Sequence, residues 1–480
     1  MARFISLACV GLSFLLSLNP SAHASGLGAP LIGTVWSGVT TTDAAAVHWN
    51  PSLLADLPGF QLQLDGNLAY ARIAYQRERR AQYQHADGLN FALPLEPHEL
   101  DPARTGVEAL VEANMVLPAG SLFASYRIID GLSVGLGAYA GFAAPLQLPH
   151  EGSQRYHVQE AFILGLYITP AIAWRPIPQL SIGAGLNVVV GSMALRQRVD
   201  LAATPLLADV LANDPINQPN DFGPDAPPAV RELDALGRDA AINGAMAVGV
   251  SFNVGVTINP IEQLTIGLTY QHGVDLTFVG DLTMDFDHDL FTKDLAFQGL
   301  SFPPIVKGKA YVELPLPASA RLGVAWRPMA FFQWHVQASY VRYSVVERLA
   351  VTIESEDLVQ ESLGLGPVAT ITMPRRWRDT VEVETLFEFQ VNETLRLGVR
   401  GGYHSPSSPD ETVDLTSIDG HRVVAGIVGS LTVGPGHVLT LGAHLHQLIP
   451  RRVVASDYDR GNGRYELTLL NVGGAYEGSF

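Results

Sequence analysis

From residue 60 onward, apolar and polar residues alternate along many segments of the chain. In one such segment, Val381, Val383, Phe387 and Phe389 alternate with acidic and amide residues. Because successive side chains of a β-strand point to opposite faces, this period predicts strands with one apolar and one polar face. The predicted strands lie at residues 60–76, 121–128, 132–142, 163–175, 180–195, 244–258, 264–282, 311–327, 332–346, 380–390, 394–404, 422–433, 437–448 and 464–480.

The connections between these strands are alternately short and long. Short turns rich in Gly, Pro and Asn lie at residues 129–131, 176–178, 259–262, 391–393 and 434–436. Polar loops of roughly 15 to 50 residues lie between them, as in outer-membrane barrels. A soluble β-sandwich also alternates, but it does not require this asymmetry. We therefore predict an all-β fold, a 14-stranded antiparallel transmembrane β-barrel over residues 60–480.

The amino-terminal segment has the pattern of a secretory signal peptide. Arg3 precedes an apolar run over residues 4–18, and Ala22 and Ala24 supply the small residues that signal peptidase accepts. Residues 1–24 are therefore predicted to be removed on export, together with Cys9, the only cysteine of the chain. Export and a barrel together predict the outer membrane of a Gram-negative bacterium.

Residues 25–59 show no sustained alternation and are rich in Gly and Ala. They are too few for a separate domain. A barrel with this many strands encloses a lumen that would otherwise conduct water. We therefore predict that residues 25–59 form an N-terminal plug, or hatch, inside the barrel.

Composition excludes several other classes of protein. The net charge is −17, and lysine occurs only at Lys293, Lys307 and Lys309, which disfavours nucleic acid as a partner. After residue 24, no run of 18 apolar residues supports a transmembrane helix. No metal site or cofactor is predicted. The acidic run 285–289 lacks the Gly and Glu of an EF-hand, so only a loose contact with divalent cations or lipopolysaccharide stays open.

Four segments carry a resemblance to a known family. The segment 43–55 contains Asn50 and Pro51, and the segments 316–328, 377–380 and 395–403 follow in the same order as in that family. Together they resemble the FadL/TodX outer-membrane transporters of long-chain fatty acids and hydrocarbons. The plug of that family carries Asn-Pro-Ala, whereas this chain has Ser52 at the third position.

The resemblance implies a passive transporter that works as a monomer. A hydrophobic small molecule would bind an outer groove, enter the barrel and leave sideways through a kinked third strand. No energy source is implied, and the movement would be coupled to a shift of the extreme N-terminus of the plug. Outer-membrane lipid and lipopolysaccharide would surround the barrel, and a last strand ending in Phe480 implies recognition by the barrel assembly machinery.

The candidate site residues form four groups. The plug and gating group comprises Ser25, Gly26, Leu27, Gly28, Asn50 and Pro51, of which Asn50 and Pro51 are expected beside the third strand. The outer capture groove comprises Leu206, Leu207, Leu211, Phe291, Leu295, Phe297 and Phe302. The lateral opening comprises Gly135, Gly137, Gly141 and Pro145, which should make the third strand irregular. The lumen charges comprise Arg321, Arg327, Glu384, Glu388, Arg396 and Arg400, with Glu388 facing Arg396 and Glu384 facing Arg400.

Simpler interpretations stay open for two of these groups and for the function. The apolar loop residues could pack on one another, and the lumen arginines could pair with lumen carboxylates rather than with a ligand. A structural or adhesin barrel is the main functional alternative. A lipid-acting barrel enzyme has less support, because the G-x-S-x-G pattern at 131–135 opens a strand after a turn rather than a strand-to-helix elbow. We therefore predict a transporter and not an enzyme.

Overall fold

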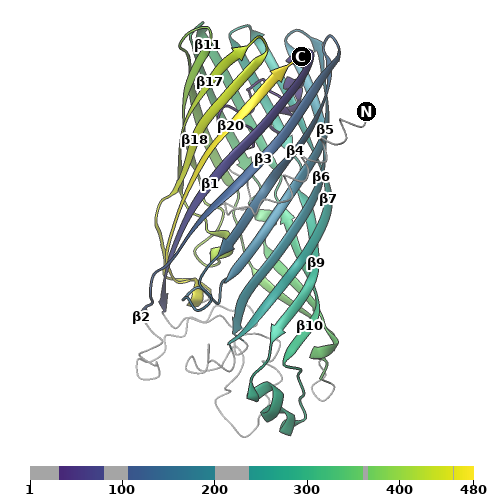
Figure 1. Ribbon diagram of the computed structural model, residues 1–480, viewed down its shortest axis with the longest axis vertical. Coiled ribbons are helices and arrows are strands. Elements are labelled where there is room, and N and C mark those ends of the chain that lie inside the picture. The colour runs from purple at the N-terminus through teal and green to yellow at the C-terminus, as the bar shows by residue number, and fades with distance from the viewer. Residues whose placement is uncertain (1–31, 80–105, 201–236, 361–365, 458) are drawn as a thin grey trace.

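The computed structural model describes residues 32–79, 106–200, 237–360, 366–457 and 459–480. Its strands form one closed antiparallel sheet, a barrel with the predicted fourteen membrane-crossing strands (Figure 1). Ten crossings are single strands: β1 (Phe60–Arg79), β3 (Val111–Ile129), β4 (Leu132–Gln147), β5 (Glu160–Ile177), β6 (Leu180–Asp200), β7 (Gly237–Ile261), β16 (Leu395–His404), β17 (Arg422–Gly434), β18 (His437–Leu448) and β20 (Gly463–Ser479). The predicted third strand is therefore β4.

The other four crossings are each built from two strands. They are β8 (Leu264–Gln271) with β9 (Val274–Asp285), β10 (Ile305–Leu316) with β11 (Ser319–Met329), β12 (Phe332–Val341) with β13 (Arg348–Glu354), and β14 (Val368–Pro374) with β15 (Thr380–Gln390). Two short strands, β2 (Gly106–Val107) and β19 (Arg451–Val453), pair with β1 and β20. The barrel closes where β1 pairs with β20, from Gln61 opposite Ser479 to Arg77 opposite Gly463.

The helices of the described residues are all short. In the segment before β1 lie α2 (Ala46–Trp49) and η1 (Pro51–Asp56). The loops carry η3 (Leu290–Asp294), η4 (Leu295–Gln298), η5 (Tyr343–Val345), η6 (Glu356–Leu358), η8 (Leu415–Ser417) and η9 (Asp459–Gly461). Among the described residues, no helix has the length and apolar character needed to cross a membrane.

The two faces of the wall follow the predicted alternation. On β15 and β16, Phe387, Leu397 and Val399 are exposed on the outer surface, whereas Glu384 and Arg400 are buried in the lumen. The apolar face can therefore meet lipid, and the charges avoid the cost of about 2 to 4 kcal/mol for a cation at the midplane. The short turns lie at one end of the barrel, at the top of Figure 1, and the long loops lie at the other.

Several strands extend further toward the long-loop end than the sequence predicts. β3 begins at Val111 rather than near residue 121, and the hairpin of β13 and β14 was not predicted. These extensions lie outside the segments whose apolar outer face produced the prediction. Their buried and exposed residues still alternate, but the exposed positions include polar residues such as Glu112 and Asn114, so no apolar outer face marks these extensions in the sequence.

Residues 32–57 lie inside the barrel near the short-turn end and fill part of its cross-section (Figure 1). Val47, Leu53, Leu54 and Ala55 are at most 1% exposed. Their position agrees with the predicted plug. Residues 25–28, predicted as its movable end, lie outside the described residues, as does the predicted signal peptide 1–24.

Candidate transport pathway

Asn50 anchors the plug through four hydrogen bonds. Its Nδ2 donates to the backbone oxygen of Val39 and to Oγ1 of Thr257, each at 2.9 Å. Its Oδ1 accepts from the backbone N–H of Ser52 at 3.3 Å and from the Ser52 hydroxyl at 2.6 Å. Because Asn50 is fully buried, losing any of these partners would leave a buried polar group unsatisfied.

The plug anchor lies beside β6 and β7, so the prediction that it lies beside the third strand is wrong. A methyl group on Gly183 of β6 would lie 2.4 Å from the carbonyl carbon of Pro51. One on Gly255 of β7 would lie 2.1 Å from Oδ1 of Asn50. Only glycine leaves room for the plug at these two wall positions, for its backbone at Gly183 and for its side chains at Gly255. We call Asn50 with these two glycines the plug socket.

Gly135 and Gly137 of β4 have a similar role, which corrects their prediction as irregular positions. Both are paired in register with β3 and with β5. Methyl groups there would lie 2.8 Å from Leu54 and 3.1 Å from Val47, so these glycines admit the plug. A glycine in a strand can mark either an irregularity or a close approach, and here it marks a close approach.

Between β3 and β4, however, part of the described barrel wall lacks strand pairing. Pairing between β3 and β4 ends at Ser121 opposite Tyr139. Beyond that point, residues 111–120 pair only with β1, and residues 140–147 pair only with β5. We call this unpaired stretch the β3–β4 seam. It lies on the strand for which the sequence predicts a lateral opening.

The irregularity of β4 is at Gly141, not at Pro145. The register between β4 and β5 shifts between Ala140 and Phe142, which leaves Gly141 as a bulge. Pro145 stays in the ladder opposite Phe162, so its predicted interruption of that ladder is wrong. A proline is tolerated in a strand with one unpaired edge, because its missing N–H need not serve a partner there.

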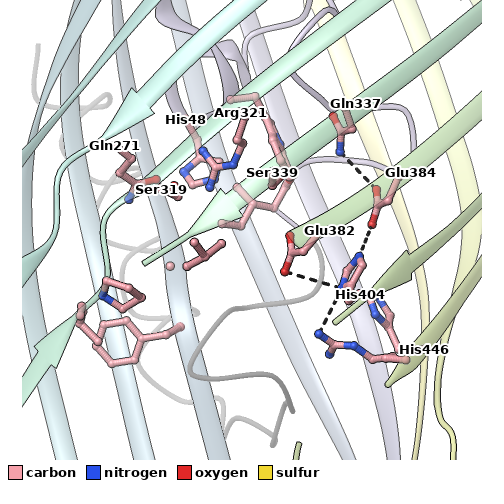
Figure 2. A pocket seen from close by; sticks show the side chains of 18 of the residues that line it. His48, Gln271, Ser319, Arg321, Gln337, Ser339, Glu382, Glu384, His404 and His446 are labelled. Atoms are coloured by element: carbon pink, nitrogen blue, oxygen red, sulfur yellow. Dashed lines mark hydrogen bonds and ion pairs between the residues drawn. The ribbon is translucent and has the colours of Figure 1, made fainter. Parts of the chain in front are cut away.

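A cavity of about 200 Å³ in the lumen is lined by residues of both the plug and the seam. Figure 2 shows the polar side chains that line it. The plug contributes His48 and Trp49, the β4 edge of the seam contributes Gly141 and Phe142, and the neighbouring β5 contributes Tyr167. The opposite side is polar and includes Arg321, Gln337, Glu382, Glu384, Arg400, His404, Arg422, His444 and His446. The cavity thus has an aromatic end and a charged end.

The charged end is an ordered network centred on Glu384. Its carboxylate accepts from Nε of Arg400 at 2.8 Å, from Nε2 of His404 at 2.8 Å and from Gln337 at 3.2 Å. Nη2 of Arg422 lies 3.1 Å from Nδ1 of His404. Because a guanidinium can only donate, Nδ1 must accept, which assigns the proton of His404 to Nε2.

Both predicted pairs of lumen charges are present. Arg400 pairs with Glu384, and Nη1 of Arg396 lies 3.2 Å from Glu388. The residues of each pair are not directly opposite, since Glu384 is opposite Gly402 and Glu388 is opposite Gly398. Arg400 also reaches the plug, because its Nη1 donates to the backbone oxygens of Val35 at 2.8 Å and Ser37 at 3.2 Å.

The other two predicted lumen arginines differ from each other. Arg321 lines the cavity, with its guanidinium carbon 5.3 Å from the ring centre of Trp49. It forms no ion pair within the described part of the chain. Burial and the positive charge of Arg321 hold the pKa of the neighbouring His48 well below its ordinary value. Arg327 is exposed and donates to Gln333 at the short-turn end, so its prediction as a lumen charge is wrong.

The predicted capture groove is described only in part. Leu206, Leu207, Leu211 and the side chain of Phe297 lie outside the described residues. Phe291, Leu295 and Phe302 are at most 7% exposed. Phe291 stacks on Phe286 at 4.7 Å, and Phe302 packs edge-on against Phe286 at 5.4 Å. This arrangement supports the interpretation that the loop packs on itself, and a capture groove stays a prediction.

The aromatic residues at the seam were missed at the sequence level. Phe123, Tyr139 and Tyr167 stack in a row at successive spacings of 5.5 Å. The signal in the sequence that could have identified them is that two aromatic residues, Tyr139 and Phe142, lie on either side of Gly141 in one predicted strand. No group of three or more His, Cys, Asp or Glu side chains within the described ranges could hold a metal ion.

Comparisons with known proteins agree with this architecture. The family model described as outer membrane protein transport protein (OMPP1/FadL/TodX) matches residues 19–440. A protein of Neisseria meningitidis serogroup B whose name assigns it to the outer membrane is 22% identical over 413 residues, covering 84% of this chain and 81% of its own.

Three solved structures have the same fold. A FadL homologue of Pseudomonas aeruginosa is 17% identical, with 96% of this chain and 99% of that chain covered and a TM-score of 0.71. The toluene transporter TodX of Pseudomonas putida is 14% identical, with coverages of 96% and 99% and a TM-score of 0.64. The toluene transporter TbuX of Ralstonia pickettii is 16% identical, with coverages of 97% and 100% and a TM-score of 0.60.

Proposed function

Since the chain belongs to the outer membrane protein transport protein family (OMPP1/FadL/TodX), we propose that it takes up hydrophobic compounds passively and releases them sideways through the β3–β4 seam. The observation that carries this proposal is the position of the cavity. Its aromatic end borders Gly141, Phe142 and Tyr167, where the pairing of β3 with β4 stops. A ligand in the cavity therefore lies next to the unpaired edges of the wall, beyond which an apolar compound would meet lipid.

Arg321 favours ligands with one anionic end, such as long-chain fatty acids, over plain hydrocarbons. Its guanidinium faces the cavity without an ion pair among the described residues. Arg321 is half-buried, and Glu382 in the same cavity lining acts on its charge without reaching ion-pair distance. A ligand carboxylate can approach more closely, because its geometry matches the donors of a guanidinium. The apolar chain of such a ligand would lie against Trp49, Phe142 and Tyr167, which line the same cavity.

The proposal extends to assembly and to the partners of the barrel. The last strand closes the barrel, since the backbone N–H of Phe480 donates to the oxygen of Phe60 at 2.9 Å and the oxygen of Phe480 accepts from the N–H of Phe60 at 3.1 Å. Because the first and the last strand pair with each other, neither of them has a free edge where the barrel closes. This supports a monomer whose terminal strand is recognised by the barrel assembly machinery, surrounded by lipid and lipopolysaccharide.

The side exit can be tested by bridging the seam. Gly120→Cys and Ala140→Cys add thiols to the two unpaired edges, at positions that follow the last paired residues, Ser121 and Tyr139. In a Gram-negative host without its own hydrophobic channel, a short bismaleimide should reduce uptake of radiolabelled long-chain fatty acid to background. A monofunctional maleimide should have little effect, because it leaves the seam free to separate.

A second thiol pair controls for chemical modification of the wall. Ala425→Cys and Leu445→Cys bridge β17 and β18, which are fully paired at that level, and uptake should persist after bridging. Persisting uptake with the seam bridged would contradict the side exit. Arg321→Gln tests the ligand class, since it should reduce uptake of the fatty acid but not of toluene.

A further inference from the structure

Two aromatic rings lie on the inner face of β4 and β5 next to the β3–β4 seam, and each lies over a glycine of the other strand. Phe142 follows the bulge in β4, and a methyl group on Gly165 of β5 would lie 1.9 Å from its ring. Tyr167 of β5 covers the bulge itself, since a methyl group on Gly141 would lie 2.3 Å from its ring. Each of the two strands therefore places one aromatic ring over a glycine of the other strand.

The two rings form a continuous surface between the cavity and the seam. Phe142 is 2% exposed and Tyr167 is 5% exposed, yet both line the cavity. Their ring centres are 6.4 Å apart and the rings are nearly perpendicular, at 89°. On the facing edge of the seam, the three residues of β3 before Ser121 are Pro118, Ala119 and Gly120. With such small residues opposite, Phe142 and Tyr167 are the largest groups at this point of the wall.

The hydrogen bonds of the aromatic row indicate which ring is free to turn. The hydroxyl of Tyr139 lies 3.1 Å from that of Thr169, which itself donates to Asn187 at 2.8 Å. The hydroxyl of Tyr167 has no hydrogen-bond partner within the described ranges. The side chain of Tyr139 is thus held in place by a hydrogen bond of its hydroxyl, whereas the side chain of Tyr167 is held by ring contacts alone. An apolar ligand can replace those contacts, because it can cover the same glycines.

We propose that Phe142 and Tyr167 form a two-ring gate that selects ligands by width at the side exit. This inference rests on the proposed function. A single alkyl chain or a flat single ring can take the place of one gate ring over its glycine, so the seam stays covered while the ligand leaves. A wider polycyclic group would have to displace both rings at once, which leaves the bulge and its neighbours uncovered.

The gate is tested by comparing a thin probe with a wide one. Uptake of radiolabelled dodecanoate and of a pyrene-labelled dodecanoate would be measured in whole cells for wild type, Phe142→Ala, Tyr167→Ala and the double variant. The ratio of wide to thin uptake should rise by at least about tenfold in the double variant, the scale on which pocket size discriminates ligands. The single variants should be intermediate.

Two further sets of variants separate the gate from general damage. Phe387→Ala removes a lipid-facing ring that stacks on Trp334 in a fully paired part of the wall, and it should keep the wild-type ratio. Gly165→Ala keeps both gate rings but pushes Phe142 from its position, so the ratio should rise without the loss of any ring. Folding is checked by outer-membrane yield and heat-modifiable mobility on gels.

The outcomes distinguish the gate from the proposed function. If wild type takes up the thin probe and the ratio does not change in the double variant or in Gly165→Ala, the gate is wrong and the transport function stands. If wild type takes up neither probe, the transport function is wrong and the gate with it. A rise in the ratio for Phe387→Ala as well would show that any loss of a ring loosens the wall, which also contradicts a gate at the seam.

Discussion

The plug contacts the barrel on two sides that use different chemistry. On one side, at the plug socket, Pro51 packs against β6 and Asn50 against β7 in a fully buried contact without charges. On the other side, Arg400 holds the backbone oxygens of Val35 and Ser37 through a charged network that borders the cavity. The socket leaves no room for displacement, whereas the charged side lies next to the space that a ligand would occupy.

This difference shows how one segment can both close a lumen and respond to its contents. Close packing of backbone against glycine depends on shape, and it fails abruptly when a group is added. A charged network depends on partners that a ligand or a proton can replace. Amide hydrogen exchange of the plug, followed by mass spectrometry, can measure both sides separately in peptides covering residues 33–41 and 46–56.

The largest effect is expected from Arg400→Ala on the charged side. The substitution removes two bonds to the plug and leaves Glu384 buried without its cation. Breaking a buried pair in this way costs about 3 to 5 kcal/mol. Exchange in residues 33–41 should therefore accelerate by roughly two to three orders of magnitude, at about 1.4 kcal/mol for each factor of ten. Exchange in residues 46–56 should change little.

A double variant identifies the source of that cost. Arg400→Ala with Glu384→Ala removes both charges, so the part due to an unpaired carboxylate should disappear and protection should recover partly. Equal exchange in the single and double variants would show that the bonds to Val35 and Ser37 carry the whole effect. Equal acceleration in both peptides would contradict the separation of the two sides.

A smaller effect is expected from Asn50→Ala in the plug socket. The substitution leaves the oxygen of Val39 without its donor and the N–H of Ser52 without its acceptor, while Thr257 keeps the Ser52 hydroxyl at 2.7 Å. Unsatisfied buried groups cost about 1 to 3 kcal/mol, so exchange in residues 46–56 should accelerate by roughly one to two orders of magnitude. Asn392→Ala is the matched control, since Asn392 orders an exposed short turn away from the plug. Unchanged exchange after Asn50→Ala would mean that shape alone holds the socket.

The sequence predicts the charged side of the plug better than the socket. The strict period of two between lipid and lumen assigns Glu384, Glu388, Arg396 and Arg400 to one face, so their pairing follows from parity alone. Gly183 and Gly255 carry no such signal, because a strand glycine can mark a bulge, a bend or a close contact. Gly135 was misassigned for the same reason, whereas Gly141 of the same predicted group is the bulge beside the seam.

The smallest effect is expected from Asp43→Asn, and it should depend on pH. Burial raises the pKa of Asp43 well above its ordinary value of 3.8, and the carboxylates of Glu477 and Asp65 raise it further. A folded-state pKa above the unfolded value means that the neutral acid stabilises the plug. This contribution is complete below about pH 3.8 and is lost as the pH rises through the raised pKa.

Asparagine imitates the neutral acid and can still accept the hydrogen bond that the Ser37 hydroxyl donates at 2.9 Å. Near pH 4, the variant and wild type should therefore show nearly equal exchange in the plug, after correction for the intrinsic rate. With rising pH, wild type should lose protection in residues 33–41 while Asp43→Asn stays level, because only wild type gains a charge beside two other carboxylates. The same slope in both proteins would place the titrating group elsewhere, with Asp65→Asn as the next variant to measure.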